Sequence, residues 1–146
     1  DVSYMDYAVA ISPEMVDGLT IGFGQGETEE TTGTVIDDQT MYATYAYGSL
    51  TVGYQVGESD GPAASNDIDF TGMGLSYAVT DDISVSYNTS TIDRADSAND
   101  QEATAIAASF TSGGITVKGT MHSSDNIGHA AASDLDAYEF NIGFAF

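Results

Sequence analysis

The stretch that decides the fold is Asp136-Ala-Tyr-Glu-Phe-Asn-Ile-Gly-Phe-Ala-Phe146. Every second residue in it is large and apolar, and the residues between are small or polar. Successive side chains of a β-strand point to opposite faces, so the pattern predicts a strand with one apolar and one polar face. The apolar face holds Tyr138, Phe140, Ile142, Phe144 and Phe146. Because aromatic rings near a strand end suit a membrane–water interface, we expect these five side chains to face lipid.

The same alternation recurs along the whole chain and predicts about nine strands, with little room for helices. The residues expected to share the outward face upstream are Met5, Tyr7, Val9, Ile11, Leu19, Ile21, Phe23, Met41, Ala43, Tyr45, Tyr47, Leu50, Val52, Tyr54, Val56, Met73, Leu75, Tyr77, Val79, Ile83, Val85, Tyr87, Ile106, Ala108, Phe110, Ile115, Val117 and Met121. The prediction is one all-β domain over residues 1–146, an antiparallel up-and-down sheet that closes into a transmembrane β-barrel.

Composition excludes several classes of protein. The chain has no Cys, which removes disulfides, thiolate metal sites and cysteine nucleophiles. Its net charge is −21 and its only basic side chains, apart from the two His, are Arg94 and Lys118, so it lacks the surface that binds nucleic acid. The longest apolar runs have about five residues, against about 20 for a membrane-spanning helix. Any contact with a membrane must therefore come through strands.

The connections between the expected strands alternate in length. The short ones are Pro13 to Gly18, Tyr47 to Ser49, Thr80 to Asp82 and Ser112 to Gly114. The long ones are Glu27 to Asp38, Glu58 to Asp67, Asp93 to Glu102 and Ser123 to Asp134. All short turns then lie at one end of the sheet and all long loops at the other, and we expect the acidic residues to belong to loops and turns.

Together, the aromatic carboxy-terminal strand, the turn alternation and the two-faced strands resemble the Gram-negative outer-membrane porins, most of all the acidic, Gly- and Tyr-rich alphaproteobacterial type. The resemblance implies a trimeric, water-filled barrel of about 16 strands in the bacterial outer membrane. It also implies short periplasmic turns, long outer loops, contact with outer-membrane lipid and lipopolysaccharide, and insertion by the barrel-assembly machinery.

The expected inward residues are small, which bears on the size of the barrel. They are Gly22, Gly24, Gly26, Gly53, Gly57, Ser84, Ser86, Asn88, Ala103, Ala105, Ala107, Ala137, Asn141 and Gly143. Such side chains cannot fill the interior of a barrel of about eight strands. Asp1 also lies on a strand that heads towards the short-turn end. We therefore expect the chain to be the carboxy-terminal part of a longer barrel, roughly strands 8 to 16.

Five polar residues are expected to point into the pore: Asp6, Lys118, His122, Glu139 and Asn141. Lys118 is the only basic residue that a strand directs inward, whereas the loops add many carboxylates. A low-dielectric wall focuses the field of such charges. The sequence thus favours a passive, cation-preferring channel for small hydrophilic solutes and ions, with no catalytic role and no cofactor.

Alternative functions rest on two clusters. Asp93, Asp96 and Asp100 could supply oxygen ligands to a loop-bound divalent ion such as Ca²⁺, although they lack the spacing of a calcium-binding hand. His122 and His129, with neighbouring Ser123, Asp125 and Asp134, invite comparison with hydrolases at the rim of a barrel. An adhesin, or a soluble or fibrous extracellular β-protein with two packed sheets, would also show the alternation.

Overall fold

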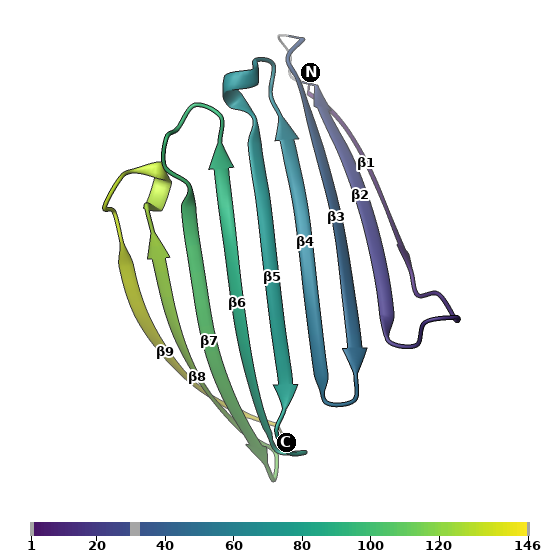
Figure 1. Cartoon of the computed structure of the whole chain (residues 1–146), viewed down its shortest axis with the longest axis vertical. Helices are drawn as coiled ribbons and strands as arrows, with labels where there is room; N and C mark the ends of the chain where they lie inside the picture. The colour runs from purple at the N-terminus through teal and green to yellow at the C-terminus, as the bar shows by residue number, and fades with distance from the viewer. Residues whose placement is uncertain (1, 30–32, 146) are drawn as a thin grey trace.

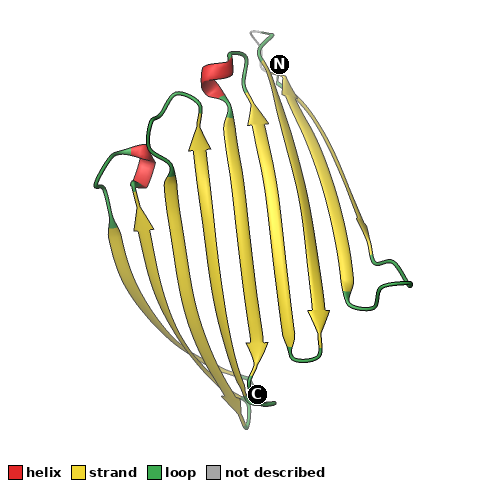
Figure 2. Ribbon diagram, viewed as in Figure 1, coloured by secondary structure: helices red, strands yellow, loops and turns green. Residues whose placement is uncertain are grey.

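The computed structural model, which describes residues 2–29 and 33–145, is one antiparallel sheet of nine strands in sequence order (Figures 1 and 2). The strands are β1 (Ser3–Ile11), β2 (Leu19–Glu29), β3 (Val35–Tyr47), β4 (Leu50–Asp60), β5 (Ile68–Ala78), β6 (Ile83–Arg94), β7 (Gln101–Ser112), β8 (Ile115–Asp125) and β9 (Leu135–Phe144). Two 3₁₀ turns, η1 (Ala64–Asn66) and η2 (Ile127–His129), lie in the connections. In the described ranges, no helix has the length and apolar character needed to cross a membrane.

The sheet is curved and open. In Figure 1 its two lateral edges, β1 and β9, recede from the viewer, so that view shows the convex face. Within the described residues β1 pairs only with β2 and β9 only with β8, which leaves one side of each edge strand unpaired. The predicted nine-stranded up-and-down sheet is confirmed, and this chain does not close it into a narrow barrel.

Glycines at positive φ let two turns approach a neighbouring strand. Gly18 has φ of +80°, and an added Cβ there would lie 2.0 Å from the carbonyl oxygen of Ala46. Gly114 also has φ of +80°, and its added Cβ would lie 2.7 Å from the carbonyl oxygen of Ala145. Both glycines instead accept backbone hydrogen bonds from these partners, at 2.9 and 2.7 Å. A side chain at either site would combine backbone strain with a direct clash.

The register puts the expected apolar residues on one face, which is the convex face. Val9, Phe23, Met41 and Val56, for example, are successive partners across β1 to β4. The apolar side chains of β9 are among the most exposed, with Phe140 at 69%. Among the described residues no large apolar side chain is buried. Phe146 lies outside the described residues, so its expected place beside them is not described.

The long connections are shorter than the sequence predicts, because the strands continue into the acidic segments. β2 runs to Glu29 and β3 starts at Val35, and β4 reaches Asp60. Residues 30–32 of the first expected loop lie outside the described residues. The backbone ladder needs no apolar side chains, so strands extend beyond the apolar band, where polar side chains meet water.

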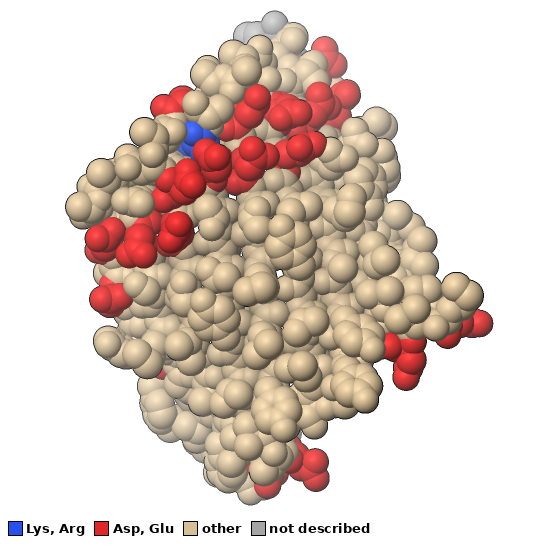
Figure 3. All heavy atoms as spheres, in the orientation of Figure 1, with Lys and Arg blue, Asp and Glu red and all other residues tan. Residues whose placement is uncertain are grey.

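Carboxylates on these strand extensions form an acidic belt on the convex face. Its members are Glu27, Glu29, Asp37, Glu58, Asp60, Asp69, Asp93, Glu102, Asp125 and Asp136. Figure 3 shows it as a red band near the long-loop end, above a broad area with few charged residues. The expectation that these acidic clusters belong to loops and turns was therefore wrong, because many of their carboxylates lie on strands. Like charges on paired strands destabilise one another, so the belt requires water or counterions.

The belt and the short turns bound the apolar band. On β4 the band comprises Val56, Tyr54, Val52 and Leu50, which spans about 20 Å at about 3.3 Å per residue. This height is comparable to the outward apolar band of transmembrane barrels.

We expect Phe140→Arg to prevent stable membrane assembly, because it places a charge within the apolar band at a cost of about 2–4 kcal/mol near the bilayer midplane. Asn141→Arg is the matched control, because the adjacent residue points to the concave face. Heat-modifiable migration of the outer-membrane fraction on gels would report folding of both variants. Normal assembly of Phe140→Arg would show that the convex face is not in lipid.

Candidate functional site: the concave face

Small residues line much of the concave face, as the sequence predicts. Gly26 pairs with Asp6 and Asp38, and Gly53 pairs with Thr44 and Gly74, all on this face. Side chains this small leave space along the inner wall. They are suited to a wall that borders water, because they give no apolar core to pack.

Three inward aromatic residues, Tyr4, Tyr42 and Phe70, were missed by the sequence analysis. A Cβ added at Gly22 would lie 2.1 Å from Tyr42 Cε1, and one at Gly72 would lie 3.0 Å from Phe70 Cζ. The absence of side chains at these glycines therefore lets the rings of Tyr42 and Phe70 lie against the sheet. Gly22 is the cross-strand partner of Tyr42. An aromatic residue at an inward position opposite a glycine is the signal from which the ring of Tyr42 could have been predicted.

Four of the expected pore-lining residues meet on β8 and β9. Lys118 pairs with Asn141, and Glu139 lies one position further along the same inward row of β9. The amide Nδ2 of Asn141 donates to Glu139 Oε1 at 2.7 Å, and His122 Nε2 lies 3.7 Å from Glu139 Oε2. We call this set the β8–β9 cluster. It combines an acid, a base and an imidazole on the inner wall.

Lys118 contributes a positive charge that remains available. In the described part of the chain its ammonium group makes no hydrogen bond or ion pair within the distances that define one. Thr120, between Lys118 and His122 on β8, is 7% exposed, and its Oγ1 has no described partner. The cluster can attract or repel mobile ions. It contains no hydrogen-bonded nucleophile and base of the kind that nucleophilic catalysis requires.

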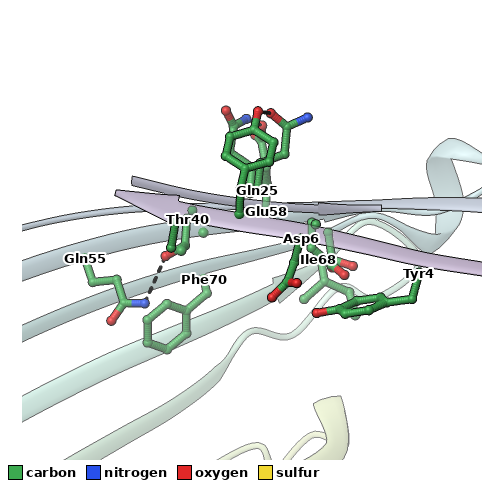
Figure 4. A pocket seen from close by; sticks show the side chains of 16 residues that line it. Tyr4, Asp6, Gln25, Thr40, Gln55, Glu58, Ile68 and Phe70 are labelled. Carbon is green, nitrogen blue, oxygen red and sulfur yellow. Dashed lines mark hydrogen bonds between the residues drawn. The ribbon is translucent and has the colours of Figure 1, made fainter. Parts of the chain in front are cut away.

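Asp6, the fifth expected pore residue, lies on the same concave face but on β1, at the opposite edge of the sheet. It borders a groove of about 450 Å³ whose lining includes Tyr4, Asp38, Gln55 and Phe70. Figure 4 shows Tyr4, Asp6, Ile68, Phe70 and Gln55 on one side of the sheet, with Gln25 and Glu58 on the opposite side. Gln55 Nε2 donates to Thr40 Oγ1 at 3.0 Å, which holds the amide near the ring of Phe70.

The expected calcium ligands do not come together. Asp93 is part of the convex acidic belt, whereas Asp96 accepts a hydrogen bond from Arg94 Nη2 at 2.8 Å. The backbone oxygen of Asp100 accepts a hydrogen bond from Asn126. No group of three or more His, Cys, Asp or Glu residues in the described ranges is arranged to hold a metal ion. The three aspartates are close in sequence, but Asp93 lies on β6, whereas Asp96 and Asp100 lie in the connection that follows it.

The residues of the alternative rim hydrolase are likewise separated. His122 and Ser123 are neighbours on β8 and therefore point to opposite faces. His129 Nδ1 lies 3.0 Å from the backbone oxygen of Asn99, and Asp134 accepts from the backbone N–H of Asn126 at 3.1 Å. His129 thus connects the β8–β9 loop to the β6–β7 loop, whereas Asp134 bonds within the β8–β9 loop itself. Neither group lies beside a nucleophile in the described contacts.

The β6–β7 and β8–β9 loops are joined by hydrogen bonds, and we call this contact the loop latch. Asn126 Nδ2 donates to the backbone oxygen of Asp100 at 3.0 Å, and Gly128 N donates to Gln101 Oε1 at 2.8 Å. Asn126 adopts a left-handed conformation with φ of 52°, which Asn tolerates better than most residues. The latch fixes two of the loops at the long-loop rim.

Comparison with solved structures places this sheet among outer-membrane barrels. It is similar to a porin refined at 1.8 Å resolution, with a TM-score of 0.76 and 16% identity over 95% of this chain and 50% of that one. It is also similar to OmpT of Vibrio cholerae, expressed in the outer membrane, with a TM-score of 0.63 and 16% identity over 97% of this chain and 55% of that one.

A bacterial polysaccharide outer-membrane secretin matches with a TM-score of 0.57 and 9% identity, over 99% of this chain and 57% of that one. No family model and no curated protein matches the chain. At these identities the comparisons establish the fold of a barrel wall, and the chain spans about half the length of the structures it resembles.

We expect Asn126→Ala to loosen the loop latch, because it removes the hydrogen bond to Asp100 and puts Ala at a left-handed position. Each lost hydrogen bond is worth about 0.5–1.5 kcal/mol. Limited proteolysis of the folded protein should then cut faster in residues 126–134. Ser133→Ala, in the same loop, removes a hydroxyl with no described hydrogen bond and should leave the rate unchanged. Equal rates in both variants would contradict the latch.

Proposed function

We propose that the chain forms part of the wall of an outer-membrane porin, a water-filled channel through which small hydrophilic solutes and ions diffuse passively. The observation that carries the proposal is the pairing of an exposed apolar convex face with a concave face rich in small and polar residues. The porin-like fold supports it. Because both edge strands have an unpaired side, further strands must complete the wall, to about 16 in a barrel of the porin type.

The proposal includes a setting and partners. Long loops face the outside, short turns face the periplasm, and the acidic belt lies near the lipopolysaccharide of the outer leaflet. The barrel-assembly machinery inserts the chain, and three copies assemble as a homotrimer of the alphaproteobacterial type. The proposal assigns the chain no catalytic reaction and no cofactor.

The orientation rests on connection length and can be tested on intact cells. Protease added outside should cut the β6–β7 loop within residues 95–100, provided that its hydrogen-bonded latch is first loosened by Asn126→Ala. The control sites are the short turns around Gly48 and Asp81, which should be protected until the outer membrane is permeabilised. Cleavage confined to those turns would invert the orientation.

The proposed cation preference follows from the charges of the concave face. Asp6, Asp38 and Glu139 are inward carboxylates on the described strands, and Lys118 and Arg94 are inward bases. The expectation that Lys118 is the only basic residue that a strand directs inward was therefore wrong. Arg94, at the end of β6, is paired with Asp96 at 2.8 Å. A low-dielectric wall strengthens the effect of this imbalance on mobile ions.

We expect a salt gradient across a planar bilayer to give a reversal potential of cation sign. Lys118→Glu should move it further towards the cation limit, and Lys118→Gln should give an intermediate value. Arg94→Gln is the comparison, because it removes the same charge at the long-loop end of β6 instead of along the wall, and it should shift the potential less. Anion preference in the unmodified protein would overturn the proposal. Folded protein with no conductance would favour a barrel without a channel role, such as an adhesin.

A further inference from the structure

The groove beside Asp6 has a composition that the passive channel does not require. Five register partners, Asp6, Gly26, Asp38, Ser59 and Ile68, form one row across β1 to β5 on the concave face. A Cβ added at Gly26 would lie 3.8 Å from the Cβ of Asp6 and 3.9 Å from that of Asp38. The missing side chain therefore leaves space between two carboxylates on alternate strands.

The next row of the concave face supplies the floor and an aromatic wall. Gly24, Thr40, Gly57 and Phe70 are partners across β2 to β5. The ring of Phe70 projects from the sheet on the same side as Asp6 and Tyr4 (Figure 4). The groove thus joins carboxylates and aromatic rings within about 450 Å³, which suits a small molecule.

No basic side chain offsets the charge of the groove. Its lining contains no Lys, Arg or His among the described residues. Arg94 is the next partner in the row, opposite Ile68, but its guanidinium is bound to Asp96. Asp6 and Asp38 therefore lack a cationic partner, and a cation from solution would provide one.

The chemistry narrows the class of ligand. Carboxylates form charge-assisted hydrogen bonds with an ammonium group, and aromatic faces attract cations and apolar groups. An anion would be repelled by both aspartates. An inorganic cation would use the carboxylates but gain little from the apolar wall. A small cation with an apolar body uses both.

We propose that this groove is a binding subsite for small organic cations, with the cationic head between Asp6 and Asp38 and the apolar body against Phe70 and Ile68. This inference rests on the proposed channel function, since it puts the subsite on the inner wall of the pore. The inference adds a class of solute, small organic cations, that would bind transiently to the wall during passage through the pore.

The test uses the complete barrel that contains this chain, reconstituted in planar bilayers. Potassium current is the readout and benzyltrimethylammonium is the probe. We expect the probe to reduce conductance at lower concentration than tetramethylammonium, which lacks the apolar body. Phenylacetate, an anion with a similar ring, should not block. Block by phenylacetate equal to that by the cation would overturn the inference.

Two near-isosteric variants assign the effect to the groove. Asp6→Asn and Phe70→Leu should each raise the half-blocking concentration about two- to five-fold, the range expected for losing one exposed cation contact. Asp81→Asn and Phe110→Leu make the same changes in a short turn and on the convex face, and should have no effect. Unchanged block in both groove variants, at normal conductance, would refute the subsite.

A direct binding measurement separates this inference from the channel function. Saturation-transfer NMR of benzyltrimethylammonium with the folded protein in detergent micelles needs no conductance. Binding that both groove variants weaken would support the subsite even if the protein does not conduct. Absence of such binding in a conducting protein would leave the channel in place and remove the subsite.

Discussion

The rest of the structure depends on where the convex apolar face finds an apolar environment. With no large apolar side chain buried in the described residues, burial inside this chain cannot supply the usual driving force for folding. An exposed face of this size is far larger than the apolar patches of soluble monomers. In the proposed outer-membrane barrel, lipid would surround these side chains. The continuous antiparallel ladder would satisfy the backbone, since unpaired N–H and C=O groups are costly in a bilayer.

The need for an apolar environment applies to the convex face and does not restrict the side chains of the concave face. The two halves of the concave face differ in their charges. On β8 and β9 the side chains of His122, Glu139 and Asn141 lie close to one another and to the free ammonium group of Lys118. On β1 to β5 the charges are carboxylates alone, and aromatic rings lie over glycines. A solute moving along the wall would meet both signs of charge on one side and only negative charge on the other.

The sequence was sufficient to predict the strands and the face on which each residue lies. Over β9, for example, the period-two alternation allows only one division of the residues between the two faces. It was also sufficient to predict inward positions for Lys118 and Glu139, which follow from the same parity. It could not predict the strand ends, because the alternation of apolar side chains stops at the edge of the apolar band while backbone pairing continues through Glu27 and Glu29.

Contacts between segments that are distant in the chain also could not be predicted from the sequence. Asp93, Asp96 and Asp100 looked like one ligand set because they are close in the chain, but the direction of each side chain depends on the strand end and the turn. The groove depends on Phe70, which lies three residues after the end of the segment that was expected to form a loop. It also depends on Gly26, whose cross-strand partners Asp6 and Asp38 are known only from the register.

If the strands cross a bilayer as proposed, the acidic belt also indicates their tilt. Glu27, Asp37 and Asp60 share one register row, Asp69 and Asp93 lie on the next, Glu102 and Asp125 on the one after, and Asp136 on a fourth. The belt thus moves by about six residues over seven strand steps, or about 20 Å along the strands for about 34 Å across them. If these carboxylates mark one level parallel to the membrane surface, the strands incline by about 30° to the membrane normal, close to the tilt of transmembrane barrels. Any strand added at either edge must continue this stagger, so the charges of the outer surface also specify the shear of the complete wall.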